Sequence, residues 1–176
     1  MIRQAETRDL DAVEQGYTDL LTHEAETGSN SNWVLGVYPT RQTAADALAR
    51  GELFVLEEDG EICASIILNQ AQAAEYQQIP WEIPAADSEV LVIHTLCIPP
   101  AKAGRGYGKR MARFALDHAR RQGCRVIRLD TWAENKPAAT LYQKLGFRLA
   151  GRAAVLHEGV IPEELIFFER DLSPAE

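Results

Sequence analysis

The chain has 176 residues, 46% of them hydrophobic, which suits one compact domain with its own core. Lys and Arg total 18 against 26 Asp and Glu, and the formal charge of -8 argues against nucleic acid or anionic membranes as partners. The first residues form no apolar run and no segment approaches the length of a membrane span, so we expect a cytoplasmic protein.

The three cysteines argue against a disulfide framework and against a metal site. Cys63, Cys97 and Cys124 are an odd number, are widely spaced, and form no C-x-x-C pair. We expect all three to be reduced and mostly buried.

Hydrophobic periodicity predicts the elements of the first half of the chain. A short strand over 2–5 precedes a helix over 9–24 with one apolar face, and a second helix covers 41–50. Segments 53–58 and 61–69 read as strands on either side of Asp59-Gly60, a pair that favours a tight hairpin turn. Segment 71–87 contains Pro80 and Pro84, which lack backbone donors, so we expect it to leave the sheet, where it could cover a substrate.

The second half begins with a nearly continuous apolar strand over 90–98, which Pro99-Pro100 ends. A glycine-rich turn and a helix over 106–122 follow, and then a strand over 125–131, a helix over 137–145, and strands over 147–156 and 165–171. This order of elements, β-α-α-β-β-β-α-β-α-β-β, predicts an α+β fold in which helices cover a sheet, as a single domain over 1–176.

The glycine-rich turn Ala103-Gly104-Arg105-Gly106-Tyr107-Gly108-Lys109 joins a buried strand to an amphipathic helix. Residues without Cβ let backbone N–H groups converge on an anion, and the free amides and positive dipole end of the helix strengthen the attraction. Cationic side chains at 102, 105 and 109 surround the turn in an otherwise acidic protein. A pyrophosphate is the guest that this arrangement indicates, and a plain connecting loop is the alternative. The glycine spacing fits neither a P-loop nor a dinucleotide fold, which argues against an oxidoreductase.

With the strand before it, the turn resembles the cofactor turn of the GNAT superfamily of N-acetyltransferases, [QR]-x-x-G-x-[GA]. Gly106 and Gly108 match the last two positions of this pattern. Ala103 stands where the family has Gln or Arg, so that side-chain contact is either missing or supplied by Lys102.

A second motif runs from Asp130 to Phe147 through a predicted strand, helix and strand. Asn135 suits a helix N-cap, and Tyr142 by itself reads as a core aromatic on the apolar stripe of the helix. The pattern N-x-x-A-x-x-x-Y-x-x-x-G-F resembles the GNAT signature in which Asn and Tyr face the cofactor; it is carried by Asn135, Ala138, Tyr142, Gly146 and Phe147.

The resemblance implies a GNAT-like fold, a mixed and mostly antiparallel sheet with splayed central strands and helices on both faces. It also implies acetyl-CoA as cofactor and an acceptor amine, on a small molecule or a peptide, that attacks the thioester directly in a ternary complex. A non-catalytic acyl-CoA-binding module is the alternative function. The strand around Leu165–Phe168 could pair across a homodimer, as such strands sometimes do in this superfamily, although proteins also protect exposed strand edges in other ways.

The same resemblance assigns roles to individual residues. Backbone groups of Leu96, Cys97 and Ile98 should lie along the pantetheine, the turn from Ala103 to Lys109 should hold the pyrophosphate, and Asn135, Ala138 and Tyr142 should face the cofactor. Tyr142 should donate a hydrogen bond to the departing thiolate, and Cys97 should act through its backbone and not as a nucleophile.

The general base has two candidates. His94 offers a neutral imidazole near pH 7, but on its strand it also reads as a core residue, and Glu89 at the strand entrance also reads as a solvated carboxylate. The acceptor pocket could be shaped by residues of the flanking loops, which are Tyr76, Trp81, His157 and Glu158.

Overall fold

The computed structural model describes residues 1–173, which form two compact units. The first unit comprises Met1–Leu68 and Thr95–Met111, and the second comprises Asn69–His94 and, as far as the chain is described, residues 112–173. The chain therefore passes between the units at three places, and each lies inside a regular element: strand β3 (Glu61–Asn69) after Leu68, strand β4 (Val90–Cys97) after His94 and helix α3 (Tyr107–Arg121) after Met111.

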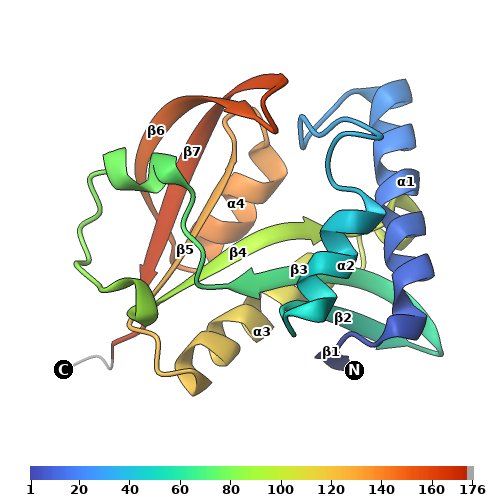
Figure 1. The fold of residues 1–176 in the computed structure, drawn as a ribbon, viewed down its shortest axis with the longest axis horizontal. Helices are drawn as coiled ribbons and strands as arrows, with labels where there is room; N and C mark the ends of the chain where they lie inside the picture. Colours follow the sequence, from blue (N-terminus) through green and yellow to red (C-terminus); the bar gives the residue numbers. More distant parts are fainter. Residues whose placement is uncertain (174–176) are drawn as a thin grey trace. The chain divides into compact units, whose positions relative to one another are not determined.

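The first unit pairs β1 (Ile2–Gln4), β2 (Leu53–Glu58) and β3 (Glu61–Asn69) in antiparallel order. The Asp-Gly pair makes the expected hairpin, and Glu58 and Glu61 face each other across its end. Helices α1 (Leu10–Thr27) and α2 (Arg41–Ala49) lie side by side in this unit (Figure 1).

The core of the first unit joins both helices to the strands. Leu10, Val13 and Tyr17 recur at helical spacing on α1 and are buried, which confirms the predicted apolar face. Helix α1 also approaches the chain after β4, because a Cβ at Gly16 would lie 3.2 Å from the ring of Pro99. A glycine at this position therefore allows the helix to pack closely on the segment that leads into the glycine-rich turn.

The second unit holds the strands in the order β4-β5-β7-β6. Strand β5 (Val126–Trp132) runs parallel to β4, with pairing from Val90↔Val126 to Ile93↔Leu129. Strand β7 (Ile161–Asp171) is antiparallel to both β5 and β6 (Arg148–His157), and helix α4 (Lys136–Lys144) precedes β6.

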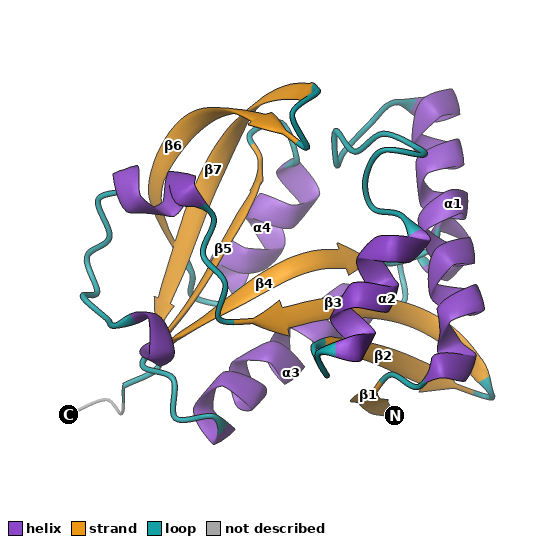
Figure 2. Cartoon of the chain, viewed as in Figure 1, coloured by secondary structure: helices purple, strands orange, loops and turns teal. Residues whose placement is uncertain are grey.

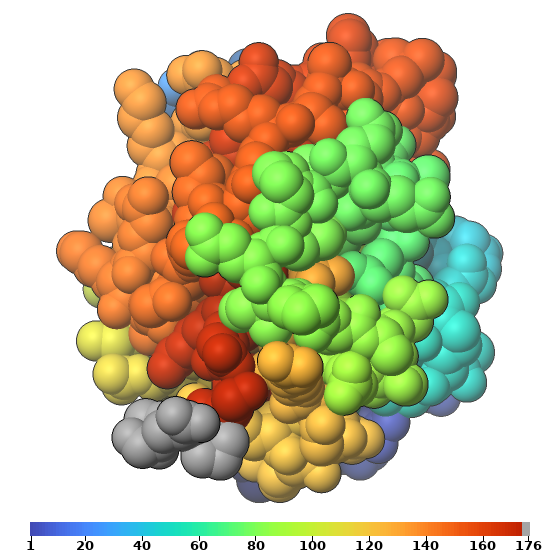
Figure 3. All heavy atoms as spheres, turned by 90° about the vertical axis from the view of Figure 1, so that its left-hand side faces the viewer, coloured from blue at the N-terminus to red at the C-terminus, as the bar shows by residue number. Residues whose placement is uncertain are grey.

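The segment between β3 and β4 leaves the sheet, as its prolines predicted, and it forms two short 3-10 turns, Ala74–Gln78 and Asp87–Glu89 (Figure 2). Within the second unit it lies over β6, where the green segment covers orange strand atoms in Figure 3. Tyr76 and Ile79 are buried with Phe167 of β7, so this segment completes the core of its unit.

Arg128 and Glu169 form a buried ion pair, with Nε and Oε2 3.9 Å apart, and both side chains bind this segment. Arg128 donates to the Ile83 carbonyl at 2.8 Å, and the Glu169 carboxylate accepts from the Glu82 amide at 2.7 Å. The guanidinium of Arg128 also lies 4.2 Å from the centre of the Trp81 ring. The segment is thus held by polar contacts that burial strengthens.

The order of the elements is confirmed, while two details of the last hairpin differ from the expectation. Strand β7 begins at Ile161 and not at Leu165, and Pro162 in this extension pairs with Leu156 of β6. Strand β5 ends at Trp132, opposite Leu165, so Pro162 has a strand neighbour on one side alone and its missing N–H is tolerated there. The strand around Leu165–Phe168, which could have paired across a homodimer, is not available for this, because β5 and β6 pair with both of its edges over these residues.

The cysteine prediction is confirmed, since Cys63, Cys97 and Cys124 are all buried free thiols. Within residues 1–173, no helix combines the length and the apolar character that crossing a membrane requires.

Candidate active site

The glycine-rich turn presents open backbone at the start of α3. Gly104 and Gly106 have φ of 75° and 77°, a left-handed conformation that residues with a Cβ adopt at a cost. A Cβ built on either glycine meets nothing within 4 Å, so a ligand can approach this backbone. Arg110 N donates to Gly106 O at 3.1 Å and closes the first helical turn, and the amides within that turn have no helical carbonyl to bond. The turn therefore has the geometry of an anion site.

Two carboxylates at the end of the β2–β3 hairpin hold this turn from both sides. Glu58 accepts from the Tyr107 phenol and, at 3.1 Å, from Arg110, while the opposite residue Glu61 pairs with Lys102. The bond from Tyr107 is the main cause that lowers the pKa of Glu58. We call these five residues the hairpin clasp. The clasp fixes the chain immediately before and after the glycines.

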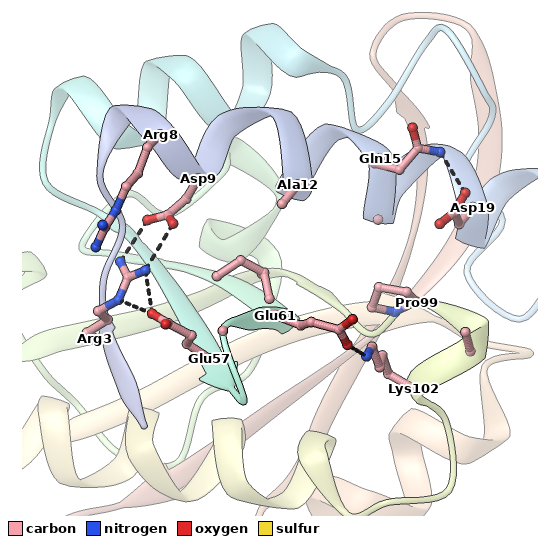
Figure 4. A pocket seen from close by; sticks show the side chains of 14 residues that line it. Arg3, Arg8, Asp9, Ala12, Gln15, Asp19, Glu57, Glu61, Pro99 and Lys102 are labelled. Carbon is pink, nitrogen blue, oxygen red and sulfur yellow. Dashed lines mark hydrogen bonds and ion pairs between the residues drawn. The ribbon is translucent and has the colours of Figure 1, made fainter.

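The side of the clasp at Lys102 borders a cavity of about 530 Å³ in the first unit (Figure 4). Figure 4 shows the Lys102 ammonium directed at Glu61, and at the other end Arg3 bonds Asp9 at 2.7 and 2.9 Å. The charge of Lys102 is therefore satisfied by the hairpin, and Arg105 and Lys109 are the exposed cations within the turn itself.

The end of β4 is bent where the chain enters the first unit. Thr95 has φ of 46°, an uncommon conformation for a β-branched residue, and its hydroxyl bonds the Tyr38 hydroxyl. Leu96 and Ile98 are half-buried, whereas Cys97 is 1% exposed and burial raises its pKa to about 12. The thiol form of Cys97 therefore dominates at neutral pH, which agrees with the prediction that it is no nucleophile.

The second motif builds α4 in the second unit. Asn135 caps the helix, since its Oδ1 accepts from the Ala138 amide at 3.2 Å. Tyr142 is 4% exposed and its ring lies 5.3 Å from that of Phe147. Burial, and secondarily the charge of Asp130, raises the pKa of the Tyr142 phenol well above its ordinary value. The hydroxyl is thus a proton donor at all physiological pH values.

Both base candidates have firm partners in the second unit. His94 Nε2 lies 2.7 Å from Asn69 Oδ1, and Glu89 Oε2 accepts from the Ala86 amide at 2.9 Å. Each side chain is half-buried. Glu89 therefore caps the short turn that opens β4, while His94 has an amide partner that can orient its ring.

Two polar pairs join residues of different elements in the second unit. The Tyr76 hydroxyl donates to Asp130 Oδ2 at 2.6 Å, and His157 Nδ1 lies 3.0 Å from Glu163 Oε1. Burial raises the pKa of Asp130, and the hydrogen bond with Glu163 raises that of His157. The sequence singled out Tyr76 and His157 but not these pairings: Asp130 entered only as the first residue of the second motif, and Glu163 lies outside the strand predicted over 165–171.

The other two residues expected near the acceptor have separate positions. The indole of Trp81 donates to the Tyr76 carbonyl at 2.8 Å, and so it supports the segment that carries Tyr76. Glu158 has φ of 51° in the β6–β7 turn, and its Oε1 lies 3.7 Å from His157 Nε2.

Comparison with known proteins gives a family match over most of the chain. The model of the Acetyltransferase (GNAT) family matches residues 18–147. Streptothricin acetyltransferase of Streptomyces lavendulae is 30% identical over 79 residues, 45% of this chain and 42% of that protein. The chain covers less than half the length of the first curated relatives that it matches.

Solved structures agree with this match in fold. A GNAT-family acetyltransferase from Streptococcus agalactiae 2603 has a TM-score of 0.82 at 20% identity, covering 99% of this chain and 96% of that one. The yncA protein of Salmonella typhimurium, whose structure holds its cofactor acetyl-CoA, has a TM-score of 0.70 at 20% identity, covering 99% and 95%. At these identities the likeness shows the fold, a seven-stranded, mostly antiparallel sheet with four helices.

Proposed function

The chain belongs to the Acetyltransferase (GNAT) family, and from this premise we propose that it transfers the acetyl group of acetyl-CoA to a primary amine. The open turn at the start of α3 is the observation that carries the proposal. Its two left-handed glycines expose backbone amides at a helix N-terminus, and a pyrophosphate is the group that such a turn holds best.

The cofactor contacts in the first unit follow the order of the chain. The amides from Ala103 to Lys109 would hold the pyrophosphate, with Arg105 and Lys109 adding charge. Backbone groups of Leu96, Cys97 and Ile98 would lie along the pantetheine, in the bent part of β4 that Thr95 begins. In this arrangement the pyrophosphate is held mainly by backbone groups. The site therefore does not require the Gln or Arg side chain that the family has at the position of Ala103.

By the family signature, Asn135, Ala138 and Tyr142 would face acetyl-CoA. Tyr142 would donate a hydrogen bond to the sulfur as the thiolate departs, and its raised pKa keeps the hydroxyl protonated until then. The amine attacks the thioester directly, which needs no enzyme nucleophile, and the buried thiol of Cys97 supports this route.

For the general base, His94 fits better than Glu89. The amide oxygen of Asn69 can hold one nitrogen of the His94 ring, whereas Glu89 is already bonded to the backbone that it caps. In general, an imidazole is also a stronger base than a carboxylate.

The proposal is tested by two measurements on the full chain. Calorimetry measures acetyl-CoA binding, and a thiol-release assay measures transfer to spermidine, ethanolamine, lysine ethyl ester and an alanyl tripeptide. Binding with transfer supports the proposal. Binding without transfer to any amine would instead favour a non-catalytic acyl-CoA-binding module, and no binding would refute the assignment of the turn.

The Tyr142→Phe variant tests the role of the hydroxyl. We expect wild-type acetyl-CoA affinity and a turnover lower by about 10- to 1000-fold, because a positioned proton donor contributes on that scale. A Phe variant with full turnover, in an assay limited by chemistry, would reduce Tyr142 to a core aromatic.

A further inference from the structure

We propose that a basic cavity formed by helices α3 and α4 and strand β7 binds a small molecule that carries two or more phosphate groups. The cavity has a volume of about 530 Å³, which suits a small-molecule site, and its lining lies wholly in the second unit. It includes none of the residues that we assign to acetyl-CoA, so the inference does not rest on the proposed acetyl transfer.

The charge of the cavity is opposite to that of the chain. Its lining has four cationic side chains and one carboxylate, whereas the whole chain has 18 Lys and Arg against 26 Asp and Glu. The four cations are Arg113, Arg120, Lys144 and Arg170, and the carboxylate is Asp117. Because charge of one sign in a concave site raises the local concentration of the opposite ion, the cavity selects anions.

Helical spacing brings the charges of α3 to one side of that helix. Arg113, Asp117 and Arg120 stand at positions i, i+4 and i+7 and therefore share a face. Arg120 and Lys144 lie in the last turns of α3 and α4, where the helix dipole favours cations. Arg113 lies in the middle of α3, beyond the reach of that effect. The helix ends thus explain two of the cations but not why four of them meet at one cavity.

Arg170 is held in a fixed orientation by the end of α4. Its Nη1 donates to the Leu145 carbonyl at 2.6 Å, and a Cβ at Gly146 would lie 3.6 Å from its Nε, so the guanidinium lies against a residue without a side chain. The Arg170 side chain is half-buried. A guanidinium that is already ordered loses little entropy when it binds an anion, and its planar fork matches two phosphate oxygens.

The positive charge of the cavity is only partly neutralised within the protein. Asp117 pairs with Arg120, with Oδ1 and Nη1 3.1 Å apart. Arg113 and Lys144 form no ion pair with any of residues 1–173. Burial, and secondarily the charge of Arg120, lowers the pKa of the Arg170 guanidinium. An anion in the cavity would offset this repulsion with attraction, which is the source of the expected affinity.

The surface of the cavity favours phosphate groups over an apolar ligand. Its two leucines, Leu116 and Leu145, are 3% and 9% exposed, so charged side chains form most of the accessible lining. Four cations against one carboxylate leave a net charge of +3. A phosphate group carries about −1.5 to −2 at pH 7, so two of them balance this charge within a small volume.

The test is a calorimetric titration of the full chain with sodium tripolyphosphate, in metal-free buffer and with CoA at saturation. Under the proposed function CoA occupies the glycine-rich turn, so the heat reports a second site, and we expect one tripolyphosphate to bind per chain. A chain that binds no CoA would refute the proposed function but not this inference, which the variants below then test without CoA.

Two double variants locate the binding. Replacing Arg113→Gln and Lys144→Gln together removes two exposed cations of the cavity and should weaken tripolyphosphate binding by about 3- to 30-fold. The matched control, Arg121→Gln with Lys136→Gln, makes the same change of charge on the same two helices outside the cavity and should leave the affinity unchanged. Asp117→Asn removes the carboxylate of the lining and should tighten binding by about two- to fivefold.

The inference is overturned if tripolyphosphate does not bind, if both double variants lose affinity equally, or if Asp117→Asn weakens binding. It is also overturned if the Arg113→Gln and Lys144→Gln variant loses affinity for acetyl-CoA but not for dephospho-CoA, because the cavity would then hold the 3′-phosphate of the cofactor. An aspartate hexapeptide that competes with tripolyphosphate and binds as tightly would assign the cavity to an acidic protein partner instead.

Discussion

Replacing Gly106 by Ala should separate the backbone requirement of the turn from its space requirement. Gly106 has φ of 77°, and a Cβ at this position meets nothing within 4 Å, so Ala adds strain without a clash. An L-residue in the left-handed region costs about 1–2 kcal/mol. If the free turn relaxes and must return to this conformation to bind, acetyl-CoA affinity should fall by about 5- to 30-fold.

Gly108→Ala is the matched control in the same turn. Gly108 lies inside α3, where Ala is favoured over Gly by about 0.5–1 kcal/mol, and the family pattern accepts Ala at this position. We expect wild-type affinity and slightly higher stability from this variant.

Calorimetry with acetyl-CoA and urea unfolding, on both variants, would locate the cost of Gly106→Ala. If the free variant keeps the strained conformation, its free energy of unfolding should be lower than that of the wild type. If its free turn relaxes, acetyl-CoA should bind more weakly, because binding must restore the strained conformation. The reasoning would be refuted by a Gly106→Ala variant that is unchanged in both, or by a Gly108→Ala variant that is equally impaired.

Three further outcomes follow from the packing. Glu58→Gln removes one of the two charged acceptors of the hairpin clasp, so acetyl-CoA affinity should fall by less than about tenfold while kcat stays constant, and an unchanged Kd would show that this half of the clasp plays no part in cofactor binding. Cys97→Ala should keep its turnover, because the buried thiol takes no part in the reaction, and an acetyl adduct on wild-type Cys97 would contradict this. Glu169→Gln leaves the buried Arg128 without its counter-charge and should lower the free energy of unfolding by about 3 kcal/mol, which urea denaturation measures; a loss below about 1 kcal/mol would show that the pair contributes little.

The parts that the sequence determined are those whose cause is local. A helix period places Leu10, Val13 and Tyr17 on one face, and an Asp-Gly pair turns the hairpin after Glu58. The glycines of the turn and the cap at Asn135 act on backbone within a few residues, so neighbouring residue types were enough to predict them.

The tertiary structure alone decided which distant polar groups meet. Tyr76 and Asp130 are 54 residues apart, and Glu58 and Tyr107 are 49 apart, so nothing in the local pattern of either partner indicates the other. The position of β7 between β5 and β6 likewise depends on strand pairing across the second unit.

The physical reason is that alternation along a strand specifies which face a side chain takes but not which strand becomes its neighbour. His157 and Glu163 became a pair only when β6 and β7 set their register. Neighbouring residue types therefore predicted the glycine-rich turn and the helix cap, whereas the pairing of His157 with Glu163 required β6 and β7 to assemble.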